Sequence, residues 1–222
     1  MRKLYIYFAF FISLFLVSQS AAYDARYEWY MNFITNIPNQ LESNPKYLAR
    51  HLAAPMQNDY DKAQAFAYWI ATHIIYDRYL YNNGASTKLL ESYKIQTPKE
   101  IMKSRVGICS DFARLFDYMC KETGVKSGII SGHALQKGEL KDEGHAWNYF
   151  MYKGRKIYVD TTFMAQGKLE VKGAISRLNR KTAIQKHARE NQKNVLYPLN
   201  PYYFDFSYKD EYMKIGIKRT ER

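Results

Sequence analysis

Cysteine is scarce in this chain, with only Cys109 and Cys120 among 222 residues. A fold that depends on several disulfides is therefore excluded. Between the two cysteines, apolar residues recur at spacings of three and four, which predicts a helix. A continuous helix would separate the two sulfurs by about 16 Å, whereas a disulfide needs Cα atoms within roughly 7 Å. We therefore expect two unpaired thiols, with Cys120 as a core residue.

Other familiar signals are missing as well. The five histidines are scattered, and no pair lies four residues apart on a helix with a third ligand nearby, so we expect no metal. The chain has no phosphate-binding glycine loop and no dinucleotide fingerprint, and we expect no cofactor. It also lacks the interleaved aromatic and basic residues of a nucleic-acid module, which makes nucleic acid the least favoured partner.

The first 22 residues have the layout of a secretory signal peptide. Arg2 and Lys3 precede an uncharged run over residues 4–17, and small residues follow up to Ala22. Fourteen residues are short for a membrane span, which needs about 20. We expect cleavage after Ala22 and a secreted or periplasmic protein; an uncleaved anchor is the alternative.

The chain is strongly basic, with a formal charge of +12. Removal of Arg2 and Lys3 would leave 12 − 2 = +10 on the mature protein. An exported protein of this charge is suited to an anionic surface such as a membrane or a wall polymer. Solubility alone is the alternative explanation.

The mature residues 23–222 are expected to form a single domain, with a core over 60–165 and a basic and aromatic extension over 166–222. The order of elements predicts an α+β fold with a helical N-terminal part. We expect helices at 27–37 and 59–77, the latter capped by Asp59 or Asp61, a loop at 82–84, and a helix from Thr97 with Glu100 completing a capping box. We expect a strand at 125–135, a loop at 136–143 and a hairpin formed by 146–152 and 155–163.

Cys109 stands where a helix is expected to begin, two residues after Gly107, which would allow a sharp turn. The positive end of the helix dipole favours a thiolate there. A thiol that attacks a carbonyl also needs a base to take its proton and an acid to orient that base. His145 and Asp160 follow in the chain and can fill those roles. A buried structural cysteine is the alternative for Cys109.

The predicted hairpin offers a test of His145 and Asp160. With a two-residue turn at Lys153 and Gly154, His145 would face Thr162 and Trp147 would face Asp160. His145 and Asp160 would then share one face as diagonal neighbours, roughly 5–8 Å apart, whereas a one-residue bulge would separate them.

Each of these residues also has a purely structural explanation. A histidine beside a tryptophan on a strand is often packing, and an aspartate before two threonines is often a cap. His133, on the preceding strand, is a rival base. Trp147 could line a substrate groove, although sheet packing explains it equally well.

Three segments carry a resemblance to a known family: residues 107–113 (GICSDFA), 144–148 (GHAWN) and 159–162 (VDTT). Together with the apolar segments around Trp69 and Ile75 and the Thr97-Pro98 pair, they resemble the transglutaminase-like superfamily over residues 60–165. The resemblance implies a papain-like architecture, in which the nucleophile's helix packs on an antiparallel β-sheet. It also implies that Cys109 is the nucleophile, His145 the general base and acid, and Asp160 the residue that orients it.

One departure from the family matters. The animal crosslinking enzymes have a tryptophan directly after the nucleophile, where this chain has Ser110. Glutamine crosslinking is therefore less well supported than thiol acyl chemistry in general. We expect an exported cysteine peptidase, amidase or related acyltransferase that acts on amide bonds of peptides or proteins. The alternative is a transglutaminase-like binding module that has lost turnover.

Overall fold

The computed structural model describes residues 27–38, 40–78, 80, 93–136, 139–167, 182, 184–186 and 197–206. Its contacts divide the chain into two units, residues 1–36 and 37–222. In the first unit, residues 27–35 are helical, as predicted. The expected signal peptide and the expected loop at 82–84 lie outside the described residues, as does most of the basic segment that follows residue 167. No helix within the described ranges is both long enough and apolar enough to cross a membrane.

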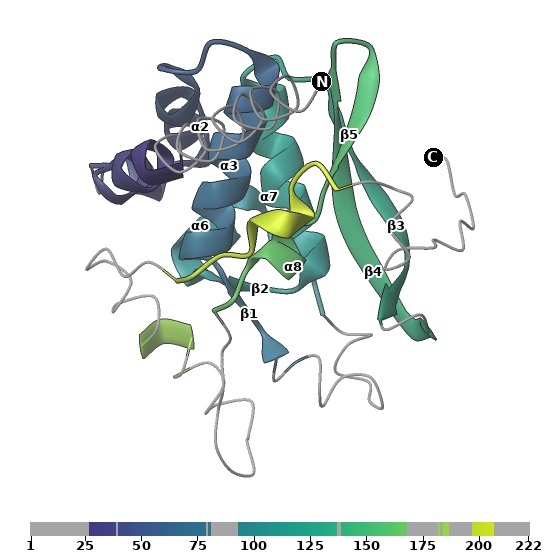
Figure 1. Ribbon diagram of the computed structural model, residues 1–222. Coiled ribbons are helices and arrows are strands. Elements are labelled where there is room, and N and C mark those ends of the chain that lie inside the picture. The colour runs from purple at the N-terminus through teal and green to yellow at the C-terminus, as the bar shows by residue number, and fades with distance from the viewer. Residues whose placement is uncertain are drawn as a thin grey trace, which may run out of the picture. The chain divides into compact units, whose positions relative to one another are not determined.

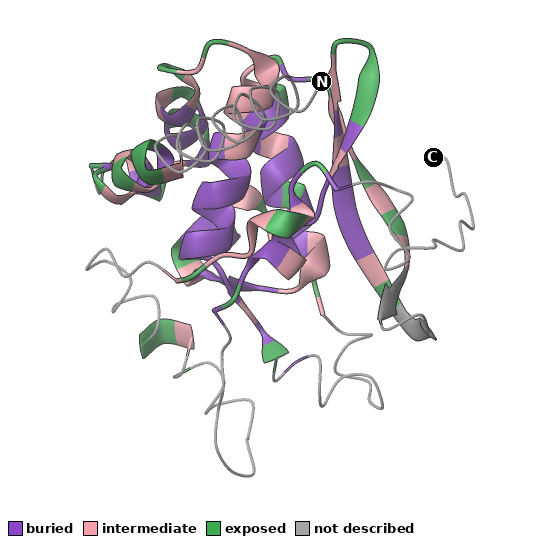
Figure 2. Cartoon of the chain, in the orientation of Figure 1, coloured by how far each residue is buried: buried purple, intermediate pink, exposed green. Residues whose placement is uncertain are grey.

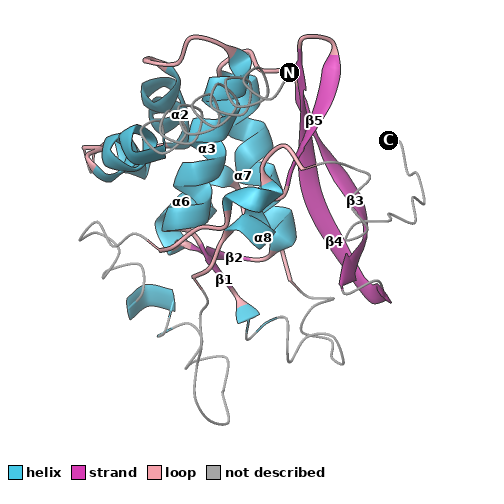
Figure 3. Cartoon of the chain, in the orientation of Figure 1, coloured by secondary structure: helices cyan, strands magenta, loops and turns pink. Residues whose placement is uncertain are grey.

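The second unit combines helices with a three-stranded sheet (Figures 1 and 3). In chain order the helical elements are η1 (Leu41–Ser43), α2 (Pro45–Ala53), α3 (Asp59–His73), α6 (Pro98–Ser104), α7 (Cys109–Glu122), α8 (Thr161–Met164) and η3 (Pro201–Tyr203). Strands β3 (Ser127–Gln136), β4 (Glu139–Tyr152) and β5 (Arg155–Val159) form the antiparallel sheet in the order β3-β4-β5. Two short strands, β1 (Ile75–Tyr76) and β2 (Val106–Gly107), pair in parallel. The α+β class predicted from the sequence is confirmed.

The core lies between α3, α7 and the sheet, where Figure 2 shows the helices and the middle of the strands as buried. In α3 the side chains from Ala65 to His73 are all buried, so this helix is covered on every side. In α7 the predicted apolar stripe, which includes Phe112, Phe116 and Cys120, is buried against α3 and β4. Burial of such a stripe is the main force that holds a helix in place.

Both predicted caps of α3, Asp59 and Asp61, were wrong. Asn58 is the cap, and its side chain accepts the N–H of Asp61 at 3.1 Å. The helix also ends at His73 rather than at 77, because the next residues are extended and pair with β2. The N–H of Ile75 donates to the carbonyl of Arg105 at 2.9 Å, and such β-branched residues suit a strand. The capping box of Thr97 and Glu100 on α6 is confirmed.

The predicted loop at 136–143 was also wrong. Strand β4 begins at Glu139, and Gln136 pairs with Glu139, so β3 and β4 form a long hairpin that includes these charged residues. The hydrogen bonds that pair two strands join backbone groups and do not require apolar side chains. The charged residues of the segment therefore did not exclude a strand.

The register of β4 and β5 agrees with the prediction up to Val159. Tyr152 pairs with Arg155 and Asn148 with Val159, around a turn in which Lys153 and Gly154 both have positive φ. Beyond Val159 the prediction was wrong, because the strand ends. Asp160 caps the short helix α8, with its Oδ1 accepting the N–H of Phe163 at 2.9 Å. The expected pairs of Trp147 with Asp160 and His145 with Thr162 therefore do not form.

The described part of the aromatic C-terminal region, residues 197–206, lies along β5 and α8. Phe204 forms an isolated bridge with Val159, and Leu199 forms one with Ala165. Phe206 packs on Trp147, on the sheet face that also includes Ile130 and Tyr158. These ten residues of the predicted aromatic extension therefore pack on the sheet and on α8.

Candidate active site

Cys109 is the first residue of α7 and is half-buried, whereas Cys120 is fully buried; neither forms a disulfide. The two unpaired thiols are as predicted. Burial raises the pKa of the Cys120 thiol, an effect that a hydrogen bond with Ser127 only partly offsets. Cys120 is thus kept as an inert thiol in the core, and Cys109 is the accessible one.

The start of α7 is fixed by Asp111. Ile108, the N-cap residue, has no side-chain acceptor, and its N–H instead donates to Asp111 Oδ2 at 2.9 Å. The same carboxylate accepts the hydroxyl of Tyr93 and the N–H of Gln96, the latter at 2.7 Å. Asp111 is completely buried, so these bonds replace the water that a carboxylate requires. The turn that carries Cys109 is therefore tied to the loop before α6.

Gly107 is needed here for close approach and not for an unusual backbone conformation. A Cβ at this position would lie 2.9 Å from the Cβ of Asp111 and 3.0 Å from a methyl carbon of Ile101. The sequence suggested a sharp turn at this glycine, but the residue belongs to β2. Its missing side chain lets Asp111 reach Ile108.

Asn148 ties the same helix to the sheet. Its side-chain amide donates to the carbonyl of Ala113 in α7 at 3.0 Å and lies 3.3 Å from the carbonyl of Gly128 in β3. Because Asn148 is three residues from His145 on β4, this contact limits sliding of the helix along the strand that carries the imidazole.

His145 and Asp160 are in direct contact. His145 Nε2 lies 2.6 Å from Asp160 Oδ2, and the carboxylate is fully buried. The side chain of Cys109 lies near enough to the same imidazole to raise its pKa, and Nδ1 is the ring nitrogen that Asp160 does not occupy. The structure thus brings together the three residues that the sequence singled out.

The electrostatics of His145 are set by its neighbours. Burial of the ring would by itself lower the pKa, but the charge and hydrogen bond of Asp160, followed by those of Cys109, raise the pKa of His145 to about 10. An imidazole in this setting stays protonated at neutral pH and can donate a proton.

The other candidates take different positions. Gly132 pairs with His145 and His133 with Gly144, so the rival base His133 lies on the opposite face of the sheet. Trp147 is stacked near His145, with ring centroids 5.8 Å apart, and is 1 % exposed. Its burial agrees with the packing explanation, and a role in substrate binding stays a prediction. Within the described ranges, no cluster of three potential metal ligands occurs.

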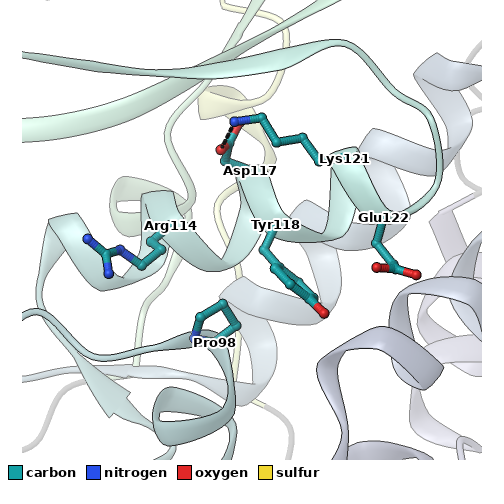
Figure 4. Close-up of a pocket in the computed structure, with 6 residues that line it drawn as sticks. All are labelled: Pro98, Arg114, Asp117, Tyr118, Lys121 and Glu122. Atoms are coloured by element: carbon teal, nitrogen blue, oxygen red, sulfur yellow. Dashed lines mark hydrogen bonds and ion pairs between the residues drawn. The ribbon is translucent and has the colours of Figure 1, made fainter. Parts of the chain in front are cut away.

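A groove of about 420 Å³ lies on the outer face of α7, beside Pro98, Arg114 and Tyr118 (Figure 4). Asp117 and Lys121 in this groove form an ion pair with N–O separation of 2.7 Å. Neither Cys109 nor His145 lines it, so we do not place the chemistry there.

Comparison with known proteins gives consistent results. The model of a family described as the transglutaminase-like superfamily matches residues 46–161, more than half of the chain. The kyphoscoliosis peptidase of Mus musculus is 27 % identical over 129 residues, and that of Homo sapiens 28 % over 122 residues. These alignments cover 55 % and 52 % of this chain but only 18 % and 17 % of the two relatives.

Among solved structures, one described as a TGase has a TM-score of 0.46 and 17 % identity, covering 70 % of this chain and 42 % of that one. A "putative cysteine protease" of Cytophaga hutchinsonii has a TM-score of 0.42 and 20 % identity, covering 58 % of this chain and 40 % of that one.

Proposed function

The chain belongs to the transglutaminase-like superfamily, and on that premise we propose that it is a thiol-dependent acyl-transfer enzyme acting on amide bonds of peptides or proteins. Cys109 is the nucleophile, His145 the general base and acid, and Asp160 the residue that orients His145. The observation that carries the proposal is the 2.6 Å contact of the His145 imidazole with the Asp160 carboxylate, together with the effect of Cys109 on the pKa of the same imidazole.

The reaction follows from this arrangement. The Cys109 thiolate attacks the amide carbonyl carbon, a C–S bond forms, and the carbonyl electron pair moves to oxygen. The N–H of Cys109 at the start of α7 supports this oxyanion. When the intermediate collapses, the C–N bond breaks, the leaving amine takes a proton from His145, and a thioester remains.

The second half of the reaction reverses the role of the imidazole. A water molecule, or an amine, attacks the thioester carbonyl while His145 removes its proton. The C–S bond then breaks, the acyl product leaves, and the thiolate and imidazolium are restored. Asp160 stabilises the imidazolium through both half-reactions and keeps Nδ1 directed at the sulfur.

Turnover can be measured with p-nitrophenyl acetate, which reports acyl transfer as released p-nitrophenolate, and with labelled casein, which reports amide cleavage. We expect Cys109→Ala and His145→Ala to lower kcat by at least about 100-fold. Cys120→Ala, which removes the buried thiol, is the matched control and should retain activity. A wild-type protein without turnover on either probe would favour the binding module.

A fluorescent primary amine added with casein identifies the acyl acceptor. Incorporation of the amine would indicate transfer, and release of peptides without incorporation would indicate hydrolysis. The departure at Ser110 favours hydrolysis.

Export and surface attachment are further parts of the proposal, supported by residues 1–22 and by the basic charge. The mature N-terminus should be Tyr23, which intact-mass measurement of the exported protein would test. Sedimentation with anionic and zwitterionic vesicles would test the preference for an anionic surface. Equal binding to both would remove that part of the proposal.

A further inference from the structure

Phe163 contacts both residues that would activate the thiol. Its ring is stacked on His145, with centroids 4.5 Å apart and the two planes within 13° of parallel. Its backbone N–H donates to Asp160 Oδ1 at 2.9 Å, opposite the oxygen that faces the imidazole. One residue in the short helix α8 therefore supports the imidazole through its ring and the carboxylate through its backbone.

Phe163 is in turn held by Tyr203, whose ring meets it edge-on at a centroid distance of 5.3 Å. The carbonyl of Tyr203 also accepts the N–H of Asp160 at 2.9 Å. Tyr203 thus contacts Asp160 directly and contacts the ring that stacks on His145.

The segment that carries Tyr203 is itself anchored on both sides. Before it, the N–H of Asn200 donates to the carbonyl of Met164 at 2.8 Å. After it, the N–H of Asp205 donates to the carbonyl of Tyr158 at 3.0 Å, and the Tyr60 hydroxyl donates to the Asp205 carboxylate at 3.0 Å. These bonds connect residues 197–206 to β5, α8 and α3.

The stacked ring matters because a histidine side chain does little by itself to fix the orientation of its imidazole. The torsion that rotates an imidazole about its bond to Cβ is broad and has little intrinsic preference. His145 must nevertheless present Nε2 to the carboxylate and Nδ1 to the sulfur at the same time. A flat ring packed parallel to the imidazole prevents that rotation, whereas an aliphatic side chain of similar volume would fill the space and restrict it less.

We propose that Phe163, held by Tyr203, is a positioning residue for His145 and Asp160, and that the working unit extends past the family-matched residues 46–161 to residue 206. The inference rests on the proposed function. It gives the aromatic C-terminal segment a part in the chemistry through its contacts with Phe163 and Asp160.

Two substitutions of Phe163 distinguish the effect of a flat ring from the effect of side-chain volume. Phe163→Leu should lower kcat for p-nitrophenyl acetate by about tenfold to a hundredfold, with KM changed less than about twofold. Phe163→Tyr, which keeps the flat ring, should retain most of kcat. Tyr47→Leu in α2 is the control, because Tyr47 is 56 % exposed and lies outside α8 and residues 197–206. It should leave both constants unchanged.

A second measurement does not depend on turnover. In the NMR spectrum of the imidazole, wild-type His145 should give one sharp set of ring signals, and Phe163→Leu should give broadened or multiple signals. If Phe163→Leu does not fold, Tyr203→Leu should lower kcat in the same way. Wild-type kcat and an unchanged His145 spectrum in the variant that folds would overturn the inference. Activity retained by Cys109→Ala would instead overturn the proposed function.

Discussion

The buried carboxylate of Asp111 accepts the N–H of Ile108 at 2.9 Å, immediately before Cys109. Asp111 is the third residue of α7, and its carboxylate bonds back to the backbone of the N-cap residue. The same carboxylate also accepts hydrogen bonds from Tyr93 and Gln96. Burial and the adjacent charge of Asp111 raise the pKa of Tyr93, which therefore stays a hydrogen-bond donor. The position of Cys109 is thus linked to a loop more than ten residues earlier in the chain.

Asp111→Ala should destabilise the fold by about 3 kcal/mol, because three part-buried donors would lose a charged, fully buried acceptor. The free energy of unfolding in urea measures this loss. Asp59→Asn is the control, since the Asp59 side chain is 42 % exposed and pairs with Lys62 on the surface. It should cost less than about 1 kcal/mol. Equal losses in the two variants would contradict the importance of the Asp111 contacts.

Gly107→Ala should cost about 1–3 kcal/mol through overpacking against Asp111 and Ile101. Gly144→Ala provides the comparison, because a Cβ there meets nothing within 4 Å. Thermal unfolding of both variants should show a lower Tm for Gly107→Ala alone. A Tm equal to that of the wild type would mean that the helix start can shift without cost.

His73 should make the fold sensitive to acid. Burial, followed by the charge of Arg105, lowers the pKa of His73 to about 3, although a hydrogen bond to the Trp69 carbonyl opposes the shift. An unfolded histidine takes up a proton near pH 6.5, so the unfolded state binds more protons below that pH. The contribution of neutral His73 to the free energy of unfolding is complete above pH 6.5 and is lost as the pH falls toward about 3.

His73→Phe keeps a ring stacked on Trp69 but does not titrate. Between pH 6.5 and 4, the free energy of unfolding should fall less steeply in this variant than in the wild type. If the free energy of unfolding falls equally steeply with pH in His73→Phe and in the wild type, groups other than His73 cause the loss of stability in acid.

The contribution of His145 to stability should change with pH in the opposite direction to that of His73. Its pKa is raised to about 10, chiefly by Asp160 against the effect of burial. The folded state therefore binds more protons above pH 6.5, and this stabilisation is full below pH 6.5 and declines as the pH rises toward about 10. An NMR titration should give a lower pKa for His145 in Asp160→Asn and, to a smaller extent, in Cys109→Ser. An unchanged pKa in Asp160→Asn would contradict the assigned cause.

The sequence predicted those features that depend on local spacing. The stripe from Phe112 to Cys120 predicted the helix that begins at Cys109, and Lys153 with Gly154 predicted the hairpin register. Prediction failed where a side chain competes with strand propensity. Thr161 and Thr162 favour a strand, but the Asp160 carboxylate caps a helical turn instead and thereby turns toward His145. His145 and Asp160 are therefore in contact, but through the cap of α8 and not through the cross-strand pairing that was predicted.

The residues that support the site were mostly missed. Asp111 had a detectable signal, since it stands three residues after Ile108, at the position from which a carboxylate can bond to the N-cap backbone. The links from Tyr93, Gln96 and Tyr203 had none, because they join segments far apart in the chain and follow no periodicity. The family resemblance located Cys109, His145 and Asp160 but not these contacts.

The most direct measurement is the rate at which iodoacetamide alkylates each cysteine at pH 6, followed by mass spectrometry in the wild type and in His145→Ala. The account predicts that Cys109 reacts rapidly, that Cys120 does not react in the folded protein, and that His145→Ala slows Cys109 by at least about tenfold. Slow labelling of Cys109 that is unaffected by His145→Ala would contradict it.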